Sequence, residues 1–139
     1  MEFLDIAHQF QASSSEAERR TSIGRSYYAL YNVLIGLLSS QGVPFENGGG
    51  DHWRLVNYLT KCNDRIAFRI GGALRDLRSV RTDADYHLNM PIEIAQSELA
   101  YKRARRAINR FDALQQSSHI HVVVQLIKQV KPFPPFRSP

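Results

Sequence analysis

The chain has 139 residues, 43% of them hydrophobic, so it is long enough for one conventional core and too short for two. Its 18 Lys and Arg residues against 13 Asp and Glu residues give a formal charge of +5, which favours phosphate-bearing or other anionic partners without choosing among them. The single cysteine, Cys62, excludes an internal disulfide and a cysteine-based metal cluster, and its apolar surroundings predict a buried thiol.

The amino-terminal segment does not have the pattern of a secretory signal. It carries acidic Glu2 and Asp5 where such a signal carries basic charge. No uninterrupted apolar stretch approaches the roughly 18 residues that are needed to cross a bilayer. We therefore expect a protein that stays in the cytoplasm and does not enter the membrane.

Apolar residues spaced by three and four predict two helices in the first third of the chain. The first covers about residues 2–11. The second begins at a capping serine at positions 14–15 and runs to Ser40, where Gly42 and Pro44 stop it. The inner stripe of this long helix is expected to be Ile23, Tyr27, Leu30, Leu34 and Leu37.

Residues 42–50 end in three glycines and have little to bury, so they are predicted to be a linker. A triple glycine can also cradle a phosphate, but no strand precedes this one and no P-loop lysine follows it. Asp51 is expected to cap a third helix that runs to about Cys62.

Two longer helices follow. An apolar period of 3.6 residues predicts a fourth helix over about residues 66–84, in which Gly71 and Gly72 indicate a close helix crossing or a bend. A fifth helix is expected from about residue 92 to residue 115. The basic side chains that flank it form the most basic surface of the chain: Lys102, Arg103, Arg105, Arg106 and Arg110.

Together these elements predict an all-α fold, an antiparallel four- to five-helix up-and-down bundle over residues 1–116. Residues 117–139 are rich in β-branched residues in their first half and in Phe and Pro in their second half. This C-terminal tail is expected to be a strand, a short helix or an arm that orders on a partner.

Two segments resemble a known family. Residues 25–31 read RSYYALY, and residues 74–87 read LRDLRSVRTDADYH. In this order and on predicted helices, they resemble the R-x-Y-Y-A-x-Y and L-x-x-L-R-x-x-R-x-x-A-D-Y motifs of the HEPN (higher eukaryotes and prokaryotes nucleotide-binding) family. The resemblance covers roughly residues 1–115 and implies a HEPN-like helical bundle that acts on RNA or nucleotides.

In the catalytic branches of that family, an R-x(4–6)-H motif forms a metal-independent ribonuclease site, and Arg81 and His87 match this spacing. The resemblance implies that Arg81 binds the scissile phosphate while His87 acts as general acid or base for attack by the ribose 2′-OH. No metal or cofactor is expected. The residues implied in substrate binding are Arg78, Asp85, Tyr86, Arg25 and Tyr28. The last two lie one turn apart and should face any cleft.

Helix geometry and the surrounding residues leave a structural alternative open. On an ideal helix Arg81 and His87 lie about 120° apart, so they converge only if the helix ends or bends, or if a second protomer completes the site. The family commonly dimerises through this segment, which implies a homodimer. The catalytic branches usually carry Asn, Asp or His where this chain has Thr82, and the Ala-Asp-Tyr branch often lacks the histidine. Arg78, Arg81 and Asp85 can equally form an ion network on one helix face.

Three functions therefore stand as hypotheses. The first is an endoribonuclease of the kind found as the toxin of toxin–antitoxin or phage-defence systems. The second is a non-catalytic module that binds RNA or a nucleotide, or that pairs with a nucleotidyltransferase-type protein or an antitoxin. The third is a helical scaffold whose basic face and Phe/Pro tail bind another protein.

Overall fold

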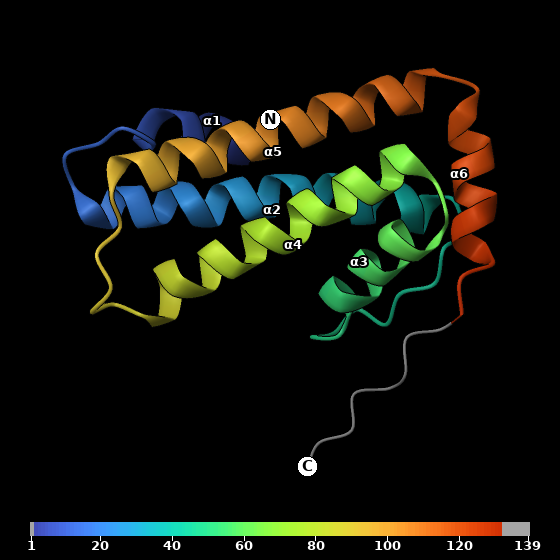
Figure 1. Ribbon diagram of the computed structural model, residues 1–139, viewed down its shortest axis with the longest axis horizontal. Helices are drawn as coiled ribbons and strands as arrows, with labels where there is room; N and C mark the ends of the chain where they lie inside the picture. Colours follow the sequence, from blue (N-terminus) through green and yellow to red (C-terminus); the bar gives the residue numbers. More distant parts are fainter. Residues whose placement is uncertain (1, 132–139) are drawn as a thin grey trace, which may run out of the picture.

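The computed structural model describes residues 2–131, which form six helices and no strand (Figure 1). They are α1 (Glu2–Phe10), α2 (Glu16–Ser40), α3 (Asp51–Lys61), α4 (Arg65–Tyr86), α5 (Ile94–Gln116) and α6 (His119–Lys128). Helices α1, α2, α4 and α5 lie roughly along the long axis, and α6 stands across one end against α5 and α3. The predicted all-α bundle is confirmed. Within this part of the chain, no helix has both the length and the apolar character that a bilayer crossing requires.

Helix α2 is the centre of the bundle and packs against α1, α4 and α5. It begins as predicted, because the Ser15 hydroxyl accepts a hydrogen bond from the backbone N–H of Glu18 at 3.3 Å. Its buried face follows the expected stripe from Ile23 to Leu34. At the end of the helix, Leu38 is fully buried and Leu37 is only partly buried, so the predicted stripe was wrong by one residue there.

The start of α3 differs from the prediction. Gly50 is the capping residue and Asp51 is the first helical residue. The buried Asp51 carboxylate turns back to accept hydrogen bonds from the backbone N–H groups of Glu46 and Gly48, at 2.9 and 3.2 Å, and from Arg54 at 2.8 Å. Burial by itself would raise the pKa of Asp51, but these donors hold it below its usual value. The Asp51 carboxylate thus accepts the backbone N–H of Gly48. A phosphate bound in the glycine-rich loop would need that same N–H as a donor.

Residues 119–128 form a helix, so the strand or arm expected for this part of the tail was wrong and the short-helix alternative was right. The helix forms because its apolar side chains recur at helical spacing and reach the core. The buried ones are Ile120, Val123, Val124 and Ile127. Residues 117–131 therefore belong to the same bundle as residues 2–116. The Phe/Pro run lies within residues 132–139, outside the described residues.

A side-chain contact fastens α6 to the start of α4. His119 Nε2 lies 2.7 Å from Asp64 Oδ1, while the other oxygen of Asp64 accepts the backbone N–H of Ala67 at 3.0 Å and so caps α4. Burial opposes ionisation of Asp64, but these two donors keep its pKa below the usual value. One carboxylate therefore both starts α4 and anchors α6.

Helices α3 and α4 cross closely at Gly71, which is one of the two alternatives, a close crossing or a bend, that the sequence left open. A Cβ atom at Gly71 would lie 2.8 Å from Leu59 Cβ and 2.9 Å from Thr60 Cγ2. Cys62 follows on the same side of α3, is 3% exposed, and places its thiol 3.6 Å from the carbonyl oxygen of Leu59. The buried cysteine expected from the sequence is confirmed, and burial raises the pKa of its thiol.

The close crossing makes the two adjacent glycines behave oppositely. Gly71→Ala should destabilise the protein by about 1–3 kcal/mol through overpacking. Gly72→Ala should be neutral or stabilise it by up to ~1 kcal/mol, because its Cβ would meet only Arg75 Nη2 at 3.8 Å and alanine favours a helix. Urea unfolding followed by circular dichroism measures both. Equal stabilities of the two variants would show that α3 and α4 are not in close contact at Gly71.

Candidate functional site

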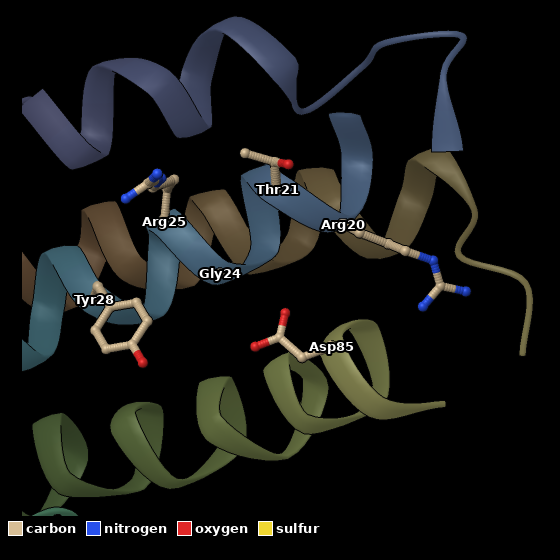
Figure 2. Close-up of a pocket in the computed structure, with 6 residues that line it drawn as sticks. All are labelled: Arg20, Thr21, Gly24, Arg25, Tyr28 and Asp85. Carbon is tan, nitrogen blue, oxygen red and sulfur yellow. The ribbon is translucent and has the colours of Figure 1, made fainter. Parts of the chain in front are cut away.

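A pocket of about 330 Å³ opens between α2 and α4, and Figure 2 shows the side chains around it. Five residues come from α2 and one from α4: Arg20, Thr21, Gly24, Arg25, Tyr28 and Asp85. We call it the α2–α4 pocket. Three of the residues expected at a binding site, Arg25, Tyr28 and Asp85, are thus brought together. A Cβ atom at Gly24 would meet nothing within 4 Å, so this glycine leaves open space in the pocket.

The pocket has a cation on one side and a carboxylate on the other. The Arg25 guanidinium lies over the ring of Phe3 at 5.1 Å and has no carboxylate partner among residues 2–131. In Figure 2, Arg25 projects on the α1 side, whereas Asp85 rises from α4 toward Gly24 and the Tyr28 hydroxyl points toward α4. A ligand that presents a negative group to Arg25 and hydrogen-bond donors to Asp85 would match this arrangement.

Arg81 lies behind this pocket and not in it. Its guanidinium is over the rings of both Tyr27 and Tyr28, at 5.4 and 5.0 Å from the ring centroids. Its Nε lies 3.0 Å from Asp85 Oδ2, with the N–H directed away from hydrogen-bond geometry, so the contact is an ion pair. The side chain is 18% exposed. The structural interpretation of Arg81 and Asp85 as partners is therefore confirmed.

His87 has a different environment at the end of α4. Its Nδ1 lies 3.0 Å from Asp83 Oδ1, and both side chains are about half exposed, at 50% and 40%. Asp83 lies two residues after Arg81, roughly 200° away around the helix. Within one chain, the structure does not bring Arg81 and His87 to a common space. The neighbouring Tyr86 is 68% exposed and also lies outside the α2–α4 pocket.

Arg78 is separated from the α2–α4 pocket as well. Its guanidinium lies over the ring of Trp53 in α3, at 4.8 Å. The ion network expected among Arg78, Arg81 and Asp85 therefore consists of the Arg81–Asp85 pair, and Arg78 is outside it. Of the seven predicted site residues, the structure groups three around one pocket, with Arg81 directly behind them, and places Arg78, Tyr86 and His87 elsewhere.

A buried polar pair lies between these two arginines. The Tyr27 hydroxyl and His52 Nδ1 are 2.8 Å apart, and His52 Nε2 has no hydrogen-bond partner in residues 2–131. Burial, followed by the positive charges of Arg78 and Arg81, lowers the pKa of His52 to about 3. Burial also raises the pKa of Tyr27. Both groups are therefore neutral near pH 7.

Sequence reasoning missed Arg20, which fixes the end of α4. Its guanidinium donates to the carbonyl oxygen of Ala84 at 2.8 Å and to Glu16 at 2.7 Å, and it also contacts the carbonyl oxygens of Leu88 and Met90. Cations suit a helix C-terminus because the last carbonyls lack partners. The residues that Arg20 binds in α4 and beyond are more than 60 positions away in the sequence, so no local pattern could indicate the contact.

The other missed pocket residues did have a local signal. Thr21 and Arg25 are four residues apart, as are Gly24 and Tyr28, which places all four on one side of α2. A small residue on that face leaves space beside polar neighbours. Reading Gly24 together with the two expected residues would have indicated the pocket.

The chain is similar to an uncharacterized protein, MJ0992, of Methanocaldococcus jannaschii, with 27% identity over 113 residues that cover 68% of this chain. The chain spans 64% of the length of that relative, just under two thirds. No family model matches the sequence. No solved structure matches it either.

The buried imidazole makes stability depend on pH in a defined direction. Below about pH 6.5 the unfolded chain binds a proton on His52, whereas the folded protein does so only near pH 3. The unfolded state then binds more protons, so stability falls as pH falls. We expect the free energy of unfolding to decrease by up to about 1.4 kcal/mol per pH unit between about pH 6 and pH 4. Asp51 and Asp64 act only at lower pH.

Urea unfolding of His52→Gln across the same pH range tests this assignment. The variant should lose most of the slope, while the exposed His121→Gln should keep it. A wild-type slope in the His52→Gln variant would show that another group causes the acid sensitivity.

Proposed function

We propose that the protein is a HEPN-like module that binds RNA or a nucleotide without cleaving it, and that the α2–α4 pocket is the binding site. The observation that carries the proposal is that Arg25, Tyr28 and Asp85 line one open pocket. The missing side chain at Gly24 leaves space in it. The pocket is near the lower end of the usual size for small ligands. A nucleotide, or one nucleotide of an RNA strand, is of the right size and carries the right groups.

Each group of a nucleotide has a counterpart in this pocket. Arg25, which has no ion-pair partner within the described part of the chain, suits a phosphate. The Tyr28 phenol can donate or accept a hydrogen bond, and Asp85 can accept from the exocyclic amine of a base. Arg81 holds Asp85 in place through the ion pair at 3.0 Å. In this proposal Arg81 is a positioning residue.

The basic face of α5 supports RNA as the ligand. None of its five basic side chains has an ion pair or hydrogen bond among residues 2–131, and all but Arg103 are exposed. Unpaired cations on one helix contact phosphates without reading sequence, and their contribution weakens as salt rises. The same face could extend the contact of a longer RNA that enters the pocket.

A metal-independent endoribonuclease, such as a toxin of a toxin–antitoxin or defence system, is the second candidate. The observation that favours it is the pair of Asp83 and His87, because a carboxylate that orients a half-exposed histidine is the usual arrangement of a general base. Arg81 and His87 of one chain do not face a common space. Cleavage would therefore need a homodimer in which a partner copy supplies the phosphate-binding cation.

The open space at Gly24 allows the pocket to be filled without disturbing the core. We expect Gly24→Leu to weaken binding of a fluorescein-labelled eight-nucleotide RNA by about tenfold or more in anisotropy titrations, because the new side chain occupies the pocket. Helix propensity predicts unchanged or higher stability of the variant.

Gly36→Leu is the matched control, since Gly36 is in the same helix and also has nothing within 4 Å of its Cβ position. It should bind the RNA like the wild type. If the two leucine variants bind RNA equally well, the α2–α4 pocket is not the binding site.

Incubation of the purified protein with total RNA in EDTA separates the two candidate functions. For a binding module we expect retention of RNA at low salt and no cleavage in any condition. His87→Ala and His121→Ala form a matched pair of histidine variants. Cleavage by the wild type that is lost only in His87→Ala would reject the binding module in favour of the ribonuclease.

A further inference from the structure

A second pocket, of about 380 Å³, opens on the other side of α4, where α3 packs against it. Its lining is Trp53, Arg75, Arg78, Ser79, Thr82 and Asp83. We call it the α3–α4 pocket. Asp83 lies about 200° around the helix from Arg81, so this pocket and the α2–α4 pocket are on different sides of α4. Residues 75–83 advance about 12 Å along the helix.

Trp53 and Arg78 form a flat, partly exposed platform in this pocket. Trp53 is 36% exposed, and the Arg78 guanidinium lies over its ring at 4.8 Å. Arg78 has no carboxylate partner among the described residues, unlike Arg54 and Arg81. Single-stranded bases stack on aromatic rings and on arginine planes, so such a pair suits an unpaired base.

The remaining groups in the pocket suit a phosphate beside that base. Arg75 Nε is 3.8 Å from Asp76, and both side chains are about half exposed, so this weak ion pair leaves Arg75 able to bind another anion. Ser79 also lines the pocket, directly after Arg78 and about one helical turn after Arg75. The Thr82 hydroxyl already donates to the Arg78 carbonyl, at 2.9 Å. Asp83, the one carboxylate in the lining, is engaged by His87 at 3.0 Å.

We propose that the α3–α4 pocket binds one nucleotide of a single-stranded RNA, with the base against Trp53 and Arg78 and the phosphate at Arg75 and Ser79. The inference extends the proposed RNA binding to a second side of α4. It rests on residues that the α2–α4 pocket does not use, so either site can fail without the other.

Trp53 supplies a local readout because it is the single tryptophan of the chain. We expect an eight-nucleotide oligouridylate to change the fluorescence of Trp53 on titration into the full-length protein, and an octa-aspartate peptide of similar charge to leave it unchanged. Arg78→Met and Arg75→Met should each weaken the response by roughly tenfold, the range that loss of a stacking or phosphate partner gives. Circular dichroism checks that both variants are folded.

Two control variants make the result specific to this pocket. Arg69→Met removes an exposed arginine of α4 that lines neither pocket and should shift the midpoint less than threefold at physiological salt. Gly24→Leu fills the α2–α4 pocket and should leave the Trp53 response in place even if overall RNA affinity falls. RNA binding by anisotropy with a constant Trp53 signal would overturn the proposal. An equal response to octa-aspartate, or wild-type titrations for both arginine variants, would also overturn it.

Discussion

The packing of the Arg81 guanidinium between α2 and α4 determines what both sides of α4 can do. A cation that is only 18% exposed needs compensation for lost hydration, and here two tyrosine rings and the Asp85 carboxylate provide it. These contacts fix the rotation of α4 about its own axis relative to α2. Asp85 is thereby turned toward the α2–α4 pocket, and the residues half a turn away are turned toward α3.

The interaction at Arg81 is one link in a series of ring and cation contacts that connects the two pockets through the interior. Each successive pair is in ring, cation–π or hydrogen-bond contact, and the members come from α1, α2, α3 and α4. Its members, in order, are Arg25, Phe3, Tyr28, Arg81, Tyr27, His52, Trp53 and Arg78. Such contacts are directional, so a displaced ring at one pocket would alter the packing of its neighbours toward the other.

The sequence was informative wherever a structural signal is local. Helix positions followed from apolar spacing, the α2 cap from Ser15, and the close crossing from Gly71, because each depends on neighbours within a few residues. The assembly of the site was only partly predictable. Arg25 and Tyr28 share a helix face, but the separation of Arg81 from His87 depends on which neighbouring helix each side of α4 meets. The carbonyls that Arg20 binds are likewise brought near only by the tertiary fold.

The corner where α3 turns into α4 contains a chemical property that is independent of any ligand. Cys62 is enclosed there at 3% exposure, and its thiol ionises less readily than a free one. A thiol-directed reagent can therefore react with the native protein only when this corner opens. The rate of modification thus reports how often α3 separates from α4, and therefore how often the α3–α4 pocket is transiently lost.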